Sequence, residues 1–170
     1  MIPIQNIYYM LSYAFQVLNE QGYKNIATEQ FNNTAELMAA ILEKGIANQL
    51  KRGLCKEYIP QTEALSSLRG KIDIAESIKT QSMLRKQLIC TYDEFSVNST
   101  MNQIIKSTVE LLLCSNISKK RKKNLRKLMI YFGEVDFIDL HTVNWNVQYN
   151  RNNQTYRMLI SICYLVVKGL

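Results

Sequence analysis

Proline, glycine and histidine are scarce in this sequence. Its 170 residues include two prolines, six glycines and one histidine. A chain with so few prolines and glycines, the residues that interrupt helices and strands, is not disordered or of low complexity. Apolar residues make up 47% of it, which is enough to bury one core, or one core and a small subdomain.

Cysteine is also sparse, and no apolar run is long. The four cysteines, at positions 55, 90, 114 and 163, lie far apart and include no C-x-x-C pair. This pattern favours buried thiols of a cytoplasmic protein over a disulfide framework or a zinc site. The N-terminus has no basic region ahead of its apolar residues, so no signal peptide is predicted. The apolar run at 158–167 has about half the length of a membrane span, which predicts a core helix and no membrane partner.

Catalytic motifs are missing as well. No G-x-x-x-x-G-K-[ST] phosphate loop occurs. His141 has no convincing cysteine or serine partner and no second metal ligand, so we interpret it as a loop residue. The carboxylate pairs Asp93–Glu94 and Glu134–Asp136 are not followed by the lysine that a magnesium nuclease needs. The sequence therefore predicts no catalytic residue, no metal site and no cofactor in this chain.

Apolar residues recur at helical spacing at both ends of the chain. Pro3 suits a helix start, and the stripe that follows consists of Ile4, Ile7, Tyr8, Leu11, Phe15 and Leu18. Thr34 is predicted to cap a second helix that ends at Gly53 and carries Gly45 on its buried face, which predicts close helix contact. Later helices are expected after Ser99, after Ser118 and over 154–168. The first of them carries Ile104, Ile105, Thr108, Val109, Leu111 and Leu112.

Residues 55–96 have the pattern of strands. Pro60 restricts the first strand to an edge. In the segment 68–74, Leu68, Ile72 and Ile74 share one strand face, and Gly70 predicts a bulge or a close backbone approach. One or two helical turns are expected over 75–80 and an extended segment over 84–95. The predicted fold is α+β: a helical core (1–54 and 97–170) with a small antiparallel β-subdomain (55–96) inserted between helices.

The charged residues of the 68–73 segment have two interpretations. Arg69, Lys71 and Asp73 could form an ordinary edge hairpin with a surface ion pair, which is common and weak. They could also flank a kink that another protein grips. The residues themselves leave both open.

A basic run gives a second candidate surface. The chain has a net charge of +7 and a pI near 9.2, which fits nucleic acid or an acidic protein as partner. Cations at a helix N-terminus oppose the helix dipole and repel one another, so solvent, acidic neighbours or phosphate must compensate. A solvated face and a nucleic-acid contact remain alternatives. The candidate nucleic-acid-binding residues are Lys119, Lys120, Arg121, Lys122, Lys123, Arg126 and Lys127.

Several blocks in order resemble the McrC family, the nuclease subunit of the McrBC modification-dependent restriction system. The blocks are 2–14 (IPIQNIYYMLSYA), 44–45 (KG), 52–54 (RGL), 68–73 (LRGKID), 102–108 (NQIIKST) and 151–156 (RNNQTY). Block 68–73 is similar to the family's K/R-G-R-I-D/E segment. The resemblance covers nearly the whole chain, and the ordered set is more specific than any one block.

The resemblance implies a division of labour. The N-terminal half of McrC docks into the central pore of a hexameric AAA+ GTPase, McrB, and stimulates GTP hydrolysis, while the C-terminal half is a PD-(D/E)xK nuclease. The nuclease signature does not occur in these residues, so we expect a fragment or a nuclease-free relative that is not itself an enzyme. GTP and Mg²⁺ are expected to bind to the partner. DNA that carries 5-methylcytosine is expected to bind in the assembled complex.

The resemblance also suggests site residues. The expected contacts to the motor pore are Arg69, Gly70, Lys71 and Asp73, with the turn at Arg151 and Asn152 as a second group. An arginine can stabilise charge on a transferring phosphoryl group or orient the residues that do so. The alternative is a basic DNA-binding adapter without a motor-activating role. A stand-alone nuclease is the third class, and the missing motifs argue against it.

Overall fold

The protein is described by a computed structural model that covers residues 2–23 and 29–169. The chain forms two compact units. The helical unit comprises Met1–Leu54 and Thr100–Leu170, and the β unit comprises Cys55–Ser99. Its second boundary follows Ser99, whereas the sequence placed it after residue 96. The α+β class predicted from the sequence is confirmed, with a three-stranded antiparallel sheet between helices.

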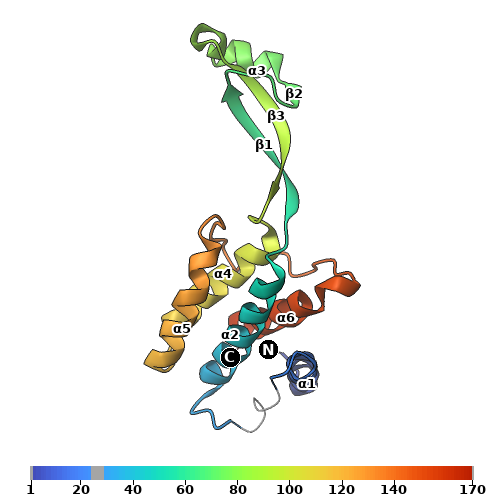
Figure 1. Ribbon diagram of the computed structural model, residues 1–170, viewed down its shortest axis with the longest axis vertical. Coiled ribbons are helices and arrows are strands. Elements are labelled where there is room, and N and C mark those ends of the chain that lie inside the picture. Colours follow the sequence, from blue (N-terminus) through green and yellow to red (C-terminus); the bar gives the residue numbers. More distant parts are fainter. Residues whose placement is uncertain (1, 24–28, 170) are drawn as a thin grey trace. The chain divides into compact units, whose positions relative to one another are not determined.

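The helical unit is built around its last helix. Helix α6 (Gln154–Lys168) packs against α1 (Ile4–Glu20), α2 (Thr34–Arg52) and α4 (Thr100–Leu113), while α5 (Lys119–Met129) packs against α2 and α4 (Figure 1). Short 3₁₀ turns follow α5 (Ile130–Phe132, η3) and precede α6 (Arg151–Asn153, η4). The predicted bounds of the final helix are confirmed. Within the described residues, no helix is both long enough and apolar enough to cross a membrane.

The contact between α2 and α6 depends on Gly45. A Cβ atom at this position would lie 2.7 Å from Leu159 Cδ2 and 2.8 Å from Met158 Cε. Met158 and Leu159 are fully buried, so the hydrogen side chain of glycine lets the two helices approach closely. The close contact predicted from the sequence is confirmed.

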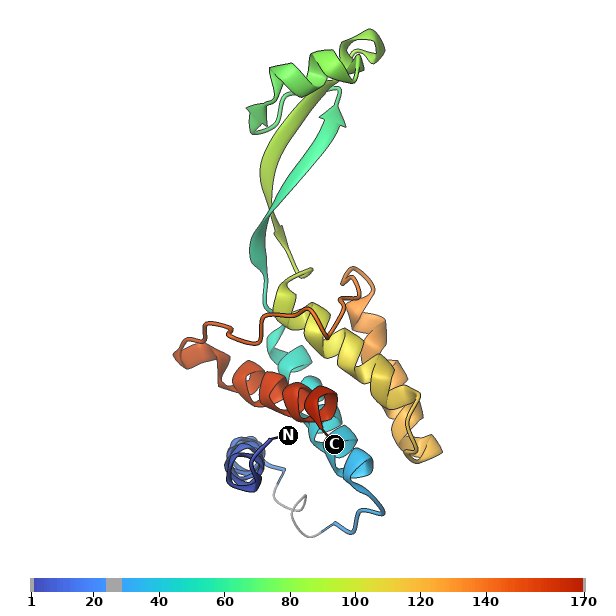
Figure 2. The same ribbon diagram turned by 180° about the vertical axis from the view of Figure 1, so that it is seen from behind.

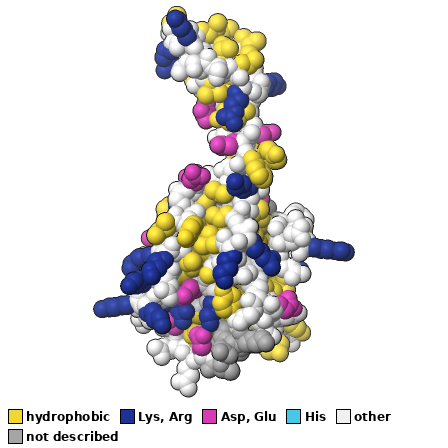
Figure 3. Space-filling model, viewed as in Figure 1, with side chains coloured by type: hydrophobic (Ala, Val, Ile, Leu, Met, Phe, Trp, Pro, Cys, Tyr) yellow, Lys and Arg dark blue, Asp and Glu magenta, His cyan; other side chains and the backbone are white. Residues whose placement is uncertain are grey.

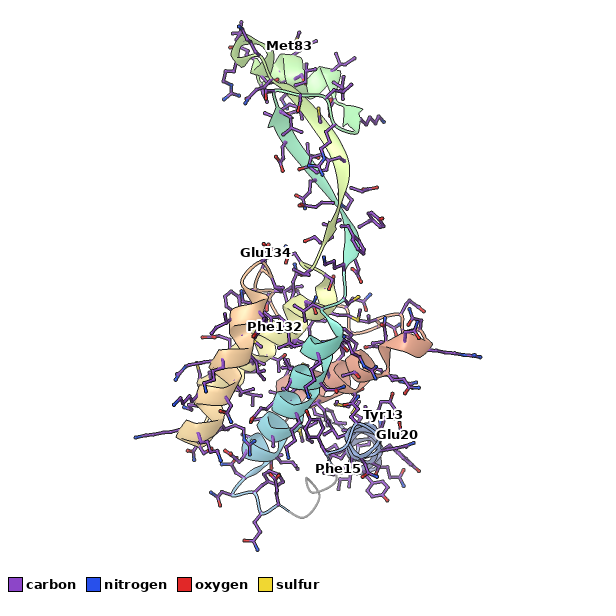
Figure 4. The ribbon with its side chains drawn as sticks, viewed as in Figure 1. Tyr13, Phe15, Glu20, Met83, Phe132 and Glu134 are labelled. Atoms are coloured by element: carbon purple, nitrogen blue, oxygen red, sulfur yellow. The ribbon has the colours of Figure 1, made fainter. Side chains whose placement is uncertain are left out.

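The segment between η3 and η4 passes along α4 on its way to α6 (Figure 2). The Lys106 ammonium on α4 donates to the carbonyl oxygen of Phe132 at 3.0 Å and also to that of Val135. The amide of Ile138 donates to Ser107 Oγ at 2.9 Å. These bonds supply partners for a connection that has no regular hydrogen-bond ladder. Phe132, labelled in Figure 4, is buried at the end of η3.

The helix caps agree with the sequence in most places. Ser118 caps α5 by accepting a hydrogen bond from the Arg121 amide at 3.2 Å, as predicted. Gly53, with φ of +91°, ends α2. The N-cap of α2 is Asn33 rather than Thr34, because the amide oxygen of Asn33 accepts the hydrogen bond from the Glu36 amide at 2.8 Å.

Neighbouring elements cover the apolar stripes unevenly, and the expectation of four buried thiols is wrong for two cysteines. The first turns of α1 are exposed, with Ile4 85% and Tyr8 67% accessible, and the buried face begins only at Ala14. Leu111 on α4 is also exposed, and of the four cysteines Cys55 is half-buried and Cys114 exposed. Periodicity identifies a helix face, but it does not tell how much of that face a neighbour covers.

The β unit consists of two long strands with short elements between them. Strands β1 (Glu57–Leu65) and β3 (Leu88–Ser96) pair antiparallel over nine residues, and β2 (Lys71–Ile72) pairs with the other side of β3. Pro60 lies on the edge strand β1, as predicted. Helix α3 (Ile74–Lys79) and the 3₁₀ turn η2 (Ser82–Arg85) connect β2 to β3. Of the strand predicted over 68–74, only Lys71–Ile72 forms a strand, because Gly70 has a positive φ on one side and Asp73 caps α3 on the other.

Candidate partner-docking site

Gly70 holds the 68–73 segment close to β3. Its φ is +66°, and a Cβ atom would lie 2.3 Å from the carbonyl oxygen of Thr91 and 2.8 Å from the Cβ of Tyr92. No side chain fits at that distance, so the backbone approach predicted from the sequence is confirmed. The approach fixes the place of the charged residues on either side.

Arg69 lies on an aromatic ring of the neighbouring strand. Its guanidinium is 4.0 Å from the ring centroid of Tyr92, a cation–π distance. The Tyr92 hydroxyl donates to Glu63 Oε1 at 2.6 Å. This hydrogen bond is the main reason that the pKa of Tyr92 is raised above its ordinary value of 10.0. The side chains of β1 and β3 thus present Arg69 at the surface.

Asp73 has a structural role at the start of α3. Its carboxylate accepts a hydrogen bond from the Glu76 amide at 2.9 Å, and its own amide donates to the carbonyl oxygen of Ile89 at 2.8 Å. Ser77 Oγ, which is buried, donates to the Asp73 carbonyl and accepts from the Ile89 amide. Asp73 and Ser77 therefore fasten α3 to β3. Among the described residues Asp73 forms no ion pair with Arg69, which removes the surface ion pair as an interpretation.

Exposed apolar side chains surround these residues at the end of the β unit that carries α3 and η2 (Figures 3 and 4, where Met83 is labelled). Leu84 is 81% accessible, and the other members of the set are 59–67% accessible. A cluster of exposed large apolar residues is typical of an interaction surface. We call this set the apolar end; it consists of Leu68, Ile74, Ile78, Met83 and Leu84.

The sequence did not identify the apolar end. The sequence places Leu68 and Ile74 on one face of a strand, whereas Ile74 opens a helix whose next turn carries the exposed Ile78. A six-residue helix with isoleucines four residues apart and few other apolar residues is a weak signal for an exposed apolar face. Lys71 is exposed beside this set, so the predicted motor contacts Arg69, Lys71 and Asp73 share one end of the unit.

The second predicted group, Arg151 and Asn152, belongs to the helical unit. Both residues are exposed in η4, where Asn150 Oδ1 accepts a hydrogen bond from the Asn152 amide at 2.9 Å. The structure thus brings Arg69, Gly70, Lys71 and Asp73 together in one unit and places Arg151 and Asn152 in the other.

Arg121 differs from the other cations of α5 because it is engaged inside the helical unit. Its Nη1 donates to Glu43 Oε2 at 2.7 Å and its Nε to Glu36 Oε1 at 3.2 Å. Burial raises the pKa of Glu36, but hydrogen bonds from the Ser118 amide and hydroxyl, together with Arg121, outweigh burial and leave the pKa below its ordinary value of 4.5. The carboxylates of Glu36 and Glu43 therefore neutralise the charge of Arg121. Arg121 is thus not part of the exposed basic surface of α5.

His141 is exposed in the segment before α6, as the sequence predicted. In residues 2–23 and 29–169, no three His, Cys, Asp or Glu side chains are grouped so that they could hold a metal ion.

Comparisons with known proteins agree on one family. The family model described as McrBC 5-methylcytosine restriction system component matches residues 5–170. The Type IV methyl-directed restriction enzyme EcoKMcrBC of Escherichia coli (strain K12) is 30% identical over 176 residues, which cover 99% of this chain and 49% of that protein. This chain therefore spans about half the length of that relative.

Two solved structures share the fold at 21% sequence identity. The first is the cryo-EM structure of the Thermococcus gammatolerans McrBC complex, with a TM-score of 0.66 over 96% of this chain and 50% of the other. The second is a half-complex from a tetradecameric assembly of T. gammatolerans McrB AAA+ hexamers with bound McrC, with a TM-score of 0.63 over 92% and 41%. Because the family model matches nearly every residue, the chain belongs to the family of McrBC 5-methylcytosine restriction system components.

Proposed function

We propose that this chain is the docking and activating region of an McrC-like subunit. It binds the pore of a hexameric AAA+ GTPase of the McrB type and stimulates GTP hydrolysis, which drives translocation and cleavage of DNA that carries 5-methylcytosine. GTP and Mg²⁺ bind to the motor, and this chain contributes no catalytic group. Family membership and the solved McrB hexamers with bound McrC support the assignment.

The apolar end is the observation that carries this proposal. Seven large apolar side chains are exposed in the β unit (Cys55–Ser99), and five of them make up the apolar end. Full burial of one such side chain stabilises an interface by about 1.5–3 kcal/mol, so the set can offset the entropic cost of association. The exposed cations Arg69 and Lys71 beside it add charge selectivity for an acidic surface of the motor.

Arg69 is the residue that we assign to activation. Its guanidinium rests on the Tyr92 ring and is 4.0 Å from the ring centroid, so less freedom is lost when it meets a partner. In the proposed complex, Arg69 orients residues of the GTPase site and thus acts as a positioning residue. An Arg69→Ala variant that still binds and fully stimulates the motor would remove it from that role.

The experiment is GTP turnover by the cognate AAA+ protein with and without this chain. A large stimulation supports a docking and activating module. Binding without stimulation would assign the trigger to other parts of the full-length subunit and would contradict the activating half of the proposal. Neither binding nor stimulation would contradict the whole proposal and favour the basic DNA-binding adapter.

A further inference from the structure

Six cations of α5 form a continuous outward face. Lys119, Lys123, Arg126 and Lys127 recur at spacings of four, three and one residue, which places them on one side of a helix. All four are exposed, whereas the opposite side carries the buried Leu125 and the engaged Arg121. In Figure 3, dark blue side chains gather over α5. We call this set, completed by the flanking Lys120 and Lys122, the basic face.

Among the residues that the structure describes, no acidic side chain forms an ion pair with the basic face. The sequence of α5 contains no Asp or Glu. Glu36 and Glu43, on the adjacent α2, bind Arg121, Ser118 and Asn124 instead. Within residues 2–23 and 29–169, none of the six cations forms an ion pair.

The position of these charges is unfavourable for the helix. Lys119 and Lys120 lie in the first turn, at the positive end of the helix dipole, and the neighbouring lysines repel one another. A bound polyanion would relieve both effects. The basic face is therefore better suited to a complex than to the isolated chain.

We propose that the basic face binds the phosphate backbone of duplex DNA without sequence preference. An 11-residue helix is about 16 Å long, which matches four to five base-pair steps along the axis of the duplex. Five of the six cations are lysines, which act as point charges toward phosphates and fix orientation rather than sequence. The amide group of Asn124, the polar side chain best able to read a base, donates to Glu43 at 2.9 Å.

This inference does not depend on docking to a motor. The basic face belongs to the helical unit, and the apolar end belongs to the β unit. A variant of α5 can therefore lose DNA binding while it keeps motor stimulation, and failure of one proposal is distinguishable from failure of the other.

The test is fluorescence anisotropy of a labelled, unmodified duplex of about 20 base pairs, titrated with the whole chain at several salt concentrations. The variant combines Lys119→Gln, Lys123→Gln, Arg126→Gln and Lys127→Gln. The matched control combines Lys51→Gln, Arg85→Gln, Lys86→Gln and Lys168→Gln, four exposed cations outside α5. Both sets remove three lysines and one arginine and lower the net charge equally.

For the wild-type chain we expect affinity to fall steeply with salt. The α5 variant should bind more weakly, and its log–log salt slope should be shallower by about 3 to 4, since each phosphate contact contributes about 0.9. The control should keep most of the slope. The control should unfold at the same temperature as the α5 variant or at a lower one. In the α5 variant, Lys119→Gln removes a positive charge from the first helical turn and Lys123→Gln reduces charge repulsion along α5.

Three results would overturn the proposal. The wild-type chain could fail to bind the duplex at low salt. The control could lose as much affinity and slope as the α5 variant, which would show attraction to the whole charge of the chain rather than to the basic face. Finally, the α5 variant could keep DNA binding yet lose binding to an acidic protein surface, measured with the AAA+ partner.

Discussion

At the scale of single residues, Gly70 determines how closely the 68–73 segment approaches β3. Its positive φ and the Thr91 oxygen are two separate constraints on the residue type. The approach in turn places Arg69 over Tyr92. One residue without a side chain thus decides where a candidate functional arginine lies.

Gly70→Ala should destabilise the β unit by about 1–3 kcal/mol, because the new Cβ atom meets a backbone oxygen that cannot move aside. Hydrogen exchange of the β3 amides measures this change. Gly22→Ala, measured by hydrogen exchange of the α1 amides in its own unit, is the control, since Gly22 also has a positive φ but no described atom lies within 4 Å of its Cβ position. Equal effects of the two substitutions would mean that the dihedral angle, and not the contact with β3, is what matters.

Glu36 makes the helical unit sensitive to acid. Its folded-state pKa is below 4.5, so its stabilising contribution is fully present above that pH and is lost as the pH falls through the lower, folded value. Glu36→Gln should flatten the pH dependence of the free energy of unfolding below about pH 5. Denaturant titrations at several pH values measure it, with the exposed Glu134→Gln as control. An unchanged slope in Glu36→Gln would show that the contacts of Glu36 with Ser118 and Arg121 carry no pH-dependent stability.

At the scale of elements, Asp73 combines a predicted partner contact with a helix cap. Asp73→Asn keeps an N-cap acceptor for α3, whereas Asp73→Ala removes it and costs about 1 kcal/mol. Because the structure gives the carboxylate an internal role, we expect Asp73→Asn to stimulate the motor nearly as well as the wild type and Asp73→Ala to stimulate less. Full loss in Asp73→Asn, with α3 intact by hydrogen exchange, would show that the charge itself contacts the motor.

Much of the helical arrangement follows from sequence pattern. The final helix has the predicted bounds, and Gly45 marks the contact with it, because helical spacing and a lone glycine on a buried face are local signals. The sequence places the start of α3 one residue late, at 75, because a cap at Asp73 and a continuing strand are both compatible with the residues 71–74. The Arg121–Glu36 pair joins residues 85 positions apart, and no local pattern predicts such a pairing.

The site was predictable in part. Family blocks pointed to Arg69, Lys71 and Asp73, and the charge run pointed to α5. The exposure of the apolar end was not predictable, since an apolar residue in a sequence reads as core until a fold shows what covers it. The distinction between Arg121 and its lysine neighbours likewise needed the positions of Glu36 and Glu43 on α2.

At the scale of the whole molecule, the two units divide the proposed work. The β unit carries the apolar end and Arg69, and the helical unit carries the basic face and the turn at Arg151. The family match runs through both units. An account in which one unit contacts a motor and the other contacts DNA therefore predicts that variants in the two units separate the two activities.

The most direct test of the central claim is GTP turnover by the AAA+ partner as a function of the concentration of this chain. Met83→Ser combined with Leu84→Ser removes two exposed side chains of the apolar end, and Ile4→Ser combined with Ile130→Ser removes two exposed apolar side chains from the helical unit. We predict that the first variant needs at least about tenfold more protein for half-maximal stimulation, while the second matches the wild type. Wild-type stimulation by the first variant would contradict docking through the β unit.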